Sequence, residues 1–120
     1  NPYISIDTML AMPALRQALK DCAAPVVAVS PIVGGAALKG PTAKMMHELG
    51  AAVSADSVAR HYRDLIDGFV LDPADAALEK AVRGLGMEVL ITPSVMTSLG
   101  DKIRLARETF AFAVALSRSN

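Results

Sequence analysis

The segment of residues 30–41 holds the residue types and spacing that best suit ligand chemistry. It reads Ser-Pro-Ile-Val-Gly-Gly-Ala-Ala-Leu-Lys-Gly-Pro and follows an apolar, strand-like run. The paired glycines Gly34 and Gly35 let backbone N–H groups approach a ligand closely, and a helix that starts after the loop favours an anionic group. Lys39 could add a mobile positive charge for a phosphate. Because the pattern is neither GxGxxG nor a Walker loop, a plain surface turn with a solvated Lys39 is the alternative.

A polar residue stands at the carboxyl end of each predicted strand, and ligands of open α/β sheets bind beyond these ends. The four residues are Asp7, Ser30, Asp72 and Thr92, which we expect along one rim. Asp7 could bind magnesium or cap the following helix, and capping is the favoured interpretation. Asp72 is expected to cap the helix that begins two residues later. The pair Asp72 and Asp75 resembles a metal site only superficially.

The remaining reactive side chains form no recognisable catalytic group. His47 and His61 lie on separate predicted helices without metal-ligand spacing, so we expect surface or packing roles. Tyr62 could pack against the sheet or reach a ligand, and packing is favoured. Met45 and Met46 are expected in the core or a pocket wall. No Ser/His/Asp or Cys/His constellation can be assembled, which disfavours a nucleophilic hydrolase.

Alternating strand and helix patterns must position these residues. The predicted strands are residues 3–6, 26–29, 69–71 and 88–92, and the predicted helices are residues 12–21, 42–49, 54–67, 74–83 and 101–116. Residues 26–29 are apolar at every position, which predicts a strand buried on both faces. Each connection is long enough for a crossover. The order therefore predicts an α/β fold, three-layered and Rossmann-like, with a mainly parallel sheet.

Two helices carry more specific burial predictions. Val58, Leu65 and Ile66 should face inward from the helix of residues 54–67. The last helix is amphipathic, and its expected buried side consists of Ile103, Ala106, Phe110, Ala113 and Val114. A sheet of only four strands should leave an edge exposed.

The composition excludes several classes of protein. The 120 residues fit one domain or part of a larger one, and 52% hydrophobic residues exclude a disordered tail. Twelve basic and twelve acidic residues give zero net charge without a Lys/Arg cluster, so we expect no nucleic-acid partner. Cys22 is the only cysteine, which excludes an internal disulfide and a cysteine-rich zinc cluster. No apolar run approaches the roughly 20 residues of a membrane span and no signal peptide is visible, so a cytoplasmic location is expected.

The order of motifs resembles one family along essentially the whole chain. Asn1-Pro2-Tyr3-Ile4-Ser5-Ile6 is similar to the SNP-x-x-SI segment of the CofD family, cut just after its Ser. Residues 27–46 resemble that family's VSPIVGG…KGP…KMM stretch. The family's later positions follow in order, at Gly50, Ser54, Ala55, Val58, Ala59, Tyr62, Asp72 to Asp75, Thr92 and Met96. The sequence is therefore identified as resembling the C-terminal half of a 2-phospho-L-lactate transferase. Residues 1–120 would be the C-terminal part of a larger domain.

Three places depart from the family pattern. Asp7-Thr8 stands where family members commonly have Gly-Pro, and Pro13-Ala14-Leu15 stands where they have Pro-Gly-Ile. Pro93-Ser94-Val95 replaces the more usual Asp-Thr-Leu before the methionine. These changes leave the predicted fold intact and leave the three-carbon acid of the substrate open.

The resemblance implies a reaction. A phospholactyl-type group (2-phospholactate, phosphoenolpyruvate or phosphoglycerate) would pass from a GDP-linked donor to the deazaflavin Fo in coenzyme F-420 biosynthesis. The ribityl hydroxyl of Fo would attack the phosphorus that bears the acid, and GMP would leave. Magnesium would neutralise the diphosphate while the backbone holds it in line.

The resemblance also implies which residues meet the substrates. Asn1 and Pro2 would face the nucleotide phosphates. The full set of expected contacts is Asn1, Pro2, Ser30, Pro31, Gly34, Gly35, Lys39, Gly40, Met45 and Tyr62. No residue can be assigned to catalysis, and the metal ligands are expected mostly upstream of Asn1. The N-terminal half of the same enzyme is thus an expected partner, a homodimer is open, and the chain alone is expected not to turn over.

Two alternatives to the transferase remain. One is a noncatalytic regulator that binds nucleotide sugars, related to the YvcK-like proteins of the same broader superfamily. The other is a structural half-domain that complements a separate N-terminal chain. The run Lys39-Gly40-Pro41 followed by Met45-Met46 favours the transferase over the regulator.

Overall fold

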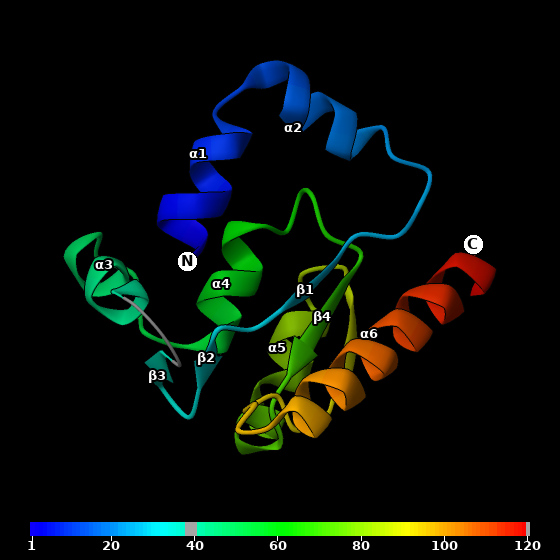
Figure 1. Ribbon diagram of the computed structural model, residues 1–120. Helices are drawn as coiled ribbons and strands as arrows, with labels where there is room; N and C mark the ends of the chain where they lie inside the picture. The colour runs from blue at the N-terminus through cyan, green and yellow to red at the C-terminus, as the bar shows by residue number, and fades with distance from the viewer. Residues whose placement is uncertain (38–40, 120) are drawn as a thin grey trace.

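A three-stranded parallel sheet organises the chain in the computed structural model, which describes residues 1–37 and 41–119 (Figure 1). Its strands are β1 Val27–Val29, β4 Gly68–Leu71 and β5 Glu88–Ile91, in the order β1-β4-β5. Both pairings are parallel, with Val27 opposite Gly68 and Phe69 opposite Val89. The central strand β4 is buried throughout, as expected of a parallel strand covered on both faces. The predicted α/β, Rossmann-like class with a parallel sheet is confirmed.

Helices cover both faces of this sheet. The helix α6, Leu99–Ser119, lies on one face, and α4, Ala55–His61, and α5, Glu79–Arg83, lie on the other (Figure 1). The remaining elements are the π-helix η1 Pro2–Ile6, α1 Asp7–Leu10, α2 Pro13–Lys20, the hairpin strands β2 Ile32–Val33 and β3 Ala36–Ala37, α3 Thr42–Glu48 and the 3-10 helix η2 Pro73–Leu78. The core lies between the sheet and α4, where Phe69, Leu71 and Val82 are fully buried. No helix among residues 1–37 and 41–119 is long and apolar enough to cross a membrane.

The prediction of a strand at residues 3–6 is wrong, because η1 and α1 occupy this region. The Asn1 side chain accepts hydrogen bonds from the amides of Tyr3 (2.9 Å) and Ile4 (3.3 Å), and Pro2 occupies the first turn. These are the local signals of a helix start. They decide the conformation here because no strand in the described residues lies beside this segment.

Two other helices are shorter than predicted. The helix expected over residues 54–67 ends at His61, and the Ser54 hydroxyl bonds to the Ser57 hydroxyl (3.0 Å) instead of capping it. The helix expected over residues 74–83 is divided into the 3-10 helix η2 and the α-helix α5, and η2 itself contains a kink at Asp75, whose backbone is non-helical (φ −109°, ψ 20°). The predicted inward positions Val58, Leu65 and Ile66 are all buried, which confirms them.

The predicted buried side of the last helix is wrong in its first half, where Ile103 (43%), Ala106 and Phe110 (72%) are exposed, whereas Ala113 and Val114 are partly buried. The buried residues of this helix are Leu105 and Leu116. The face that packs is set by Gly68 on β4: a Cβ there would lie 2.7 Å from Phe112 Cε2 and 2.8 Å from Leu116 Cδ1. Helix and strand therefore meet through Phe112 and Leu116, and a second apolar stripe of α6 faces outward.

Candidate functional site

The carboxyl ends of the three parallel strands gather the chain's polar loop residues at one edge of the sheet. Ser30 follows β1, Asp72 follows β4 and Thr92 follows β5, so these three share the rim that the sequence predicted. Asp7 follows no strand and lies in the first turn of α1. It does not cap that helix either, since no side chain caps α1, so the capping prediction for Asp7 is wrong.

Each rim side chain is already engaged in hydrogen bonds that shape its loop. Ser30 Oγ donates to the Ile32 carbonyl (2.9 Å) and accepts from the Ile32 amide (3.1 Å). Thr92 Oγ1 bonds to Glu108 and accepts from Arg104 Nη1 (3.0 Å), which fastens β5 to α6. These hydroxyls therefore hold the rim in shape.

Asp72 is the most strongly bonded carboxylate of the rim. It caps η2 by accepting from the Ala74 amide (2.9 Å), as predicted, and it also accepts from the Ser94 amide (2.9 Å) and hydroxyl (3.4 Å). Burial by itself would raise the pKa of Asp72, but these hydrogen bonds outweigh it and hold the pKa below the usual value. Asp72 thus joins the loops after β4 and β5 as a charged group.

The glycine pair forms the turn of the β2–β3 hairpin. Gly34 (φ 60°) and Gly35 (φ 82°) join Val33 to Ala36, which stand opposite each other. Two consecutive positive φ angles are those of a type I′ turn, the two-residue turn that matches strand twist. The loop predicted over residues 30–41 therefore contains a hairpin, and its two glycines are required first by backbone geometry.

Asp75 fixes this hairpin to the rim. Both oxygens of its buried carboxylate accept from the Gly34 amide, at 3.2 and 3.1 Å. Sequence reasoning missed this role; the signal was a second aspartate three residues after the rim residue Asp72. The Gly34 amide already donates to Asp75. Its contact with a phosphate therefore stays a prediction, and that contact would require the hydrogen bond to Asp75 to break.

The start of the chain is tied to α4 through a polar cluster. Tyr62 Oη donates to Asp7 Oδ1 (2.9 Å) and lies 3.1 Å from the Pro2 carbonyl, and His61 Nε2 lies 2.8 Å from Asp7 Oδ2. Burial, then the hydrogen bond to Asp7, raise the pKa of Tyr62 well above its usual value, so this phenol is a neutral donor. The His61 ring also contacts the rings of Tyr3 and Tyr62. The cluster holds Pro2 in place beside the rim.

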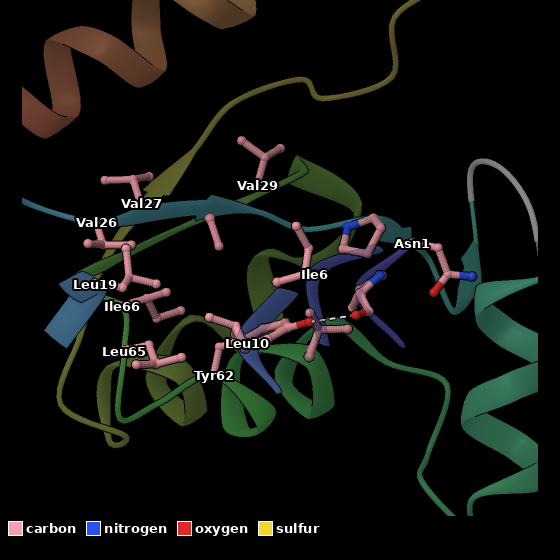
Figure 2. Close-up of a pocket in the computed structure, with 14 residues that line it drawn as sticks. Asn1, Ile6, Leu10, Leu19, Val26, Val27, Val29, Tyr62, Leu65 and Ile66 are labelled. Atoms are coloured by element: carbon pink, nitrogen blue, oxygen red, sulfur yellow. Dashed lines mark hydrogen bonds between the residues drawn. The ribbon is translucent and has the colours of Figure 1, made fainter. Parts of the chain in front are cut away.

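An open cleft of about 400 Å³ runs along β1 and ends at this cluster (Figure 2). Asn1, Pro2, Pro31 and Tyr62 line its polar end. The body of the cleft is apolar and is lined by Ile6, Leu10, Leu19, Val26, Val58, Leu65 and Ile66, among others. A charged ligand group suits only the polar end, where side chains and backbone offer hydrogen bonds.

The predicted contact residues fall into three groups. Asn1, Pro2, Pro31, Met45 and Tyr62 come together, since Asn1 Nδ2 lies 3.6 Å from Met45 Sδ and the other three line the same cleft. Ser30, Gly34 and Gly35 lie on the adjoining rim and hairpin. Lys39 and Gly40 lie outside the described residues.

The described residues do not fit a magnesium site. They contain no group of three or more Asp, Glu, His or Cys side chains that could hold a metal ion. The rim carboxylates Asp72 and Asp75 are bonded to amides, and Asp7 is bonded to Tyr62 and His61. No step of the chemistry can therefore be derived through a metal held by these residues.

Comparison with known proteins decides the family. The family model described as 2-phospho-L-lactate transferase CofD matches residues 1–99. The chain belongs to the CofD family. A phosphoenolpyruvate transferase of Streptomyces coelicolor is 40% identical over 114 residues, which are 94% of this chain and 36% of the relative. A 2-phospho-L-lactate transferase of Methanocaldococcus jannaschii is 39% identical over 116 residues, or 97% of this chain and 36% of the relative.

The match to CofD relatives has two consequences. The chain spans little more than a third of the length of these relatives, so their activity belongs to proteins with further residues. Another 2-phospho-L-lactate transferase, from Methanosarcina mazei, is 41% identical over 106 residues, 88% of this chain and 34% of the relative. Relatives named for two different acids thus match the chain almost equally well. Sequence identity alone therefore does not show which acid a protein with this sequence would use.

Proposed function

We propose that the full-length protein is a transferase that moves a phospholactyl-type group from a GDP-linked donor to the deazaflavin Fo. The observation that carries the proposal is the family match over residues 1–99, which includes the polar end of the cleft and the hairpin beside it. The group transferred is 2-phospholactate, phosphoenolpyruvate or phosphoglycerate. The product is the phosphoester of Fo in coenzyme F-420 biosynthesis.

The proposed reaction forms one P–O bond and breaks another. The ribityl hydroxyl oxygen of Fo attacks the phosphorus that bears the acid, the bond to the bridging oxygen of the diphosphate breaks, and GMP leaves with that oxygen. The hydroxyl proton is released. Magnesium, when bound, would neutralise the diphosphate, and its ligands would come mostly from outside this chain.

The residues of this chain would position substrates. Pro2 and Asn1 would lie against the nucleotide phosphates, held there by Tyr62 and by the capping bonds of Asn1. The hairpin of Gly34 and Gly35, held by Asp75, would form the adjoining wall for Fo and the diphosphate. Such positioning contributes to phosphoryl-type transfer because its rate depends chiefly on orientation and charge stabilisation.

The decisive experiment is turnover by the full-length protein. Purified protein is given Fo, magnesium and each of the three GDP-linked acids in turn, and GMP and the Fo phosphoester are measured by chromatography with mass spectrometry. We expect both products in equal amounts with one acid preferred. Binding of the guanosine nucleotide without turnover of any acid would contradict the transferase and favour the nucleotide-sugar-binding regulator.

The role of the loop is tested in the same protein by Lys39→Ala. We expect its affinity for GDP or Fo to fall by about tenfold, which corresponds to the loss of one charge-assisted contact. Lys44→Ala is the matched control, because Lys44 lies exposed on α3 and forms a surface ion pair with Glu48 (3.8 Å). Unchanged affinity of Lys39→Ala for both ligands would remove the loop from the site without touching the assignment of the reaction.

A further inference from the structure

The carboxylate of Asp7 joins the start of the chain to the end of α4. Its Oδ1 atom accepts a hydrogen bond from Tyr62 Oη (2.9 Å), and its Oδ2 atom lies 2.8 Å from His61 Nε2. His61 is the last residue of α4, and Tyr62 follows it as the C-cap. One side chain thus contacts two consecutive residues that lie 54 and 55 positions away in the sequence.

The backbone of Asp7 also closes the π turn of η1. The Asp7 amide donates to the Pro2 carbonyl, which is the wide hydrogen-bonded ring that defines a π-helix. Tyr62 Oη lies 3.1 Å from the same carbonyl oxygen. A phenol has one hydrogen, so the Pro2 carbonyl and the Asp7 carboxylate share it. Asp7 therefore contacts Pro2 directly through its amide and indirectly through Tyr62.

The side-chain contacts of Asp7 fasten this turn to α4. A π turn is rare and frequently occurs at a functional site, because a regular α-helical turn would bring a different amide to the Pro2 carbonyl. The bonds of the Asp7 carboxylate to Tyr62 and His61 keep Asp7 in the position that the wider turn requires. The His61 ring is held by the rings of Tyr3 and Tyr62, whose centroids lie 5.0 and 4.7 Å away.

The turn in its turn places the first two residues of the chain. Asn1 and Pro2 lie at the polar end of the cleft of about 400 Å³ (Figure 2). Asn1 Oδ1 accepts from the amides of Tyr3 (2.9 Å) and Ile4 (3.3 Å), so this side chain moves with the turn. A change in the register of η1 would therefore displace both residues relative to α4.

We propose that Asp7 is a positioning residue for the nucleotide-binding end of the cleft. With Tyr62 and His61 it holds the π turn, and the turn holds Asn1 and Pro2 where the phosphates of a nucleoside diphosphate would meet them. The inference rests on the proposed function for the identity of this ligand. It goes beyond that function because it assigns a role to Asp7 and His61, neither of which lines the cleft.

The charge of Asp7 makes the proposal easy to distinguish from a plain electrostatic effect. The Asp7 carboxylate and the Pro2 carbonyl share the Tyr62 hydroxyl, so a phosphate at Pro2 lies near a negative charge. Removal of that charge alone would strengthen the binding of GDP, because like charges repel. Removal of the positioning contacts would weaken it. The two effects therefore predict opposite changes in GDP affinity for Asp7→Ala.

Calorimetric titration of the full-length protein with GDP and, separately, with Fo tests the role. We expect Asp7→Ala to raise the Kd for GDP about tenfold and to leave the Kd for Fo within about twofold, because the hairpin forms the proposed wall for Fo. Asp7→Asn should stay within about threefold of the parent for GDP, since its amide oxygen can still accept from Tyr62. Asp64→Ala is the matched control and should change neither Kd. Asp64 also links the N-terminal helices to the residues after α4, but its partner Arg16 (2.7 Å) belongs to α2 and not to the π turn.

Each outcome of the titrations bears on the proposal. An unchanged or lower Kd for GDP in Asp7→Ala would overturn it, and so would equal losses of affinity for GDP and Fo, which indicate a general loosening of the fold. If circular dichroism shows that Asp7→Ala is unfolded, His61→Phe decides, because it keeps a ring against Tyr3 and Tyr62 and removes the bond to Asp7. We expect the Kd of this variant for GDP to rise about threefold, and an unchanged Kd would overturn the proposal. A parent protein that binds no GDP would instead overturn the proposed function, and this inference with it.

Discussion

At the scale of the residue, Asp75 shows how the rim is built from side chains that substrates need not touch. Its buried carboxylate holds the Gly34 amide with two contacts of 3.1 and 3.2 Å, and this bond spans 41 positions of sequence. A hydrogen bond to a charged acceptor contributes about 1.5–3 kcal/mol, more than a neutral one. We therefore regard Asp75 as a positioning residue for the hairpin.

The substitution Asp75→Asn is expected to destabilise the full-length protein by about 1–3 kcal/mol, because it removes the charge that the Gly34 amide faces. Urea unfolding measures the change. Asp64→Asn is the matched control: Asp64 is an exposed carboxylate paired with Arg16 at 2.7 Å, and such surface pairs contribute about 0–1 kcal/mol. An equal loss of unfolding free energy in both variants would show that the Asp75–Gly34 hydrogen bond stabilises the protein no more than a surface ion pair does.

Asp72 predicts a dependence of stability on pH. Its folded-state pKa is held below the ordinary 3.8 by the Ser94 and Ala74 amides, despite burial. A depressed carboxyl pKa contributes stability that is fully present above the unfolded value and is lost as pH falls through the folded value. Asp72→Asn should therefore be less stable than the parent at neutral pH, and the difference should shrink in acid below the ordinary carboxyl pKa. A difference in unfolding free energy that stays constant over this range would contradict the assignment.

At the scale of the element, the β2–β3 hairpin depends on backbone conformation more than on space. Gly35 has φ 82°, and an added Cβ would meet nothing closer than the Val53 carbonyl at 3.8 Å. Gly35→Ala should therefore cost about 1–2 kcal/mol through the left-handed backbone alone. Gly84→Ala is the control, since Gly84 has φ −63° at a helix end and its nearest contacts would be 3.4 Å. Comparable losses of unfolding free energy in the two variants would contradict a type I′ turn.

Local signals explain which elements could be predicted. The positions of α2, β1 and α3 were predicted closely, because Pro13, the apolar run of residues 26–29 and Gly50 each act within their own segment. The burial on both faces that was predicted for residues 26–29 is wrong: among the described strands β1 lies at the edge of the sheet, and Val29 is 38% exposed. The strand predicted at residues 3–6 rested on a short, β-favouring alternation, which the helix-start signals of Asn1 and Pro2 outweigh. The buried face of α6 could not be read from its pattern, since apolar residues lie on two sides and Gly68 on a distant strand selects one.

At the scale of the whole molecule, the candidate site depends on contacts that no local pattern reveals. Strand order alone predicted that Ser30, Asp72 and Thr92 share a rim, because parallel strands align their carboxyl ends. It could not predict that Tyr62 reaches the Pro2 carbonyl across 60 positions. Nor could it predict that Asp75 takes the Gly34 amide. Such pairings are products of packing around the sheet.

The same view of the whole molecule predicts that residues 1–120 alone do not turn over. The described part of the chain has no cluster of metal ligands, its rim carboxylates are bonded to protein groups, and its sheet has an open edge beside the cleft. Residues 1–120, given Fo, magnesium and a GDP-linked acid, should release GMP at the rate of the protein-free background. The full-length protein under the same conditions is the positive control, and circular dichroism of residues 1–120 establishes whether they are folded. Release of GMP above background by the folded chain alone would show that the reacting groups lie within these 120 residues, and the search for them would then begin with Tyr62 and Lys39.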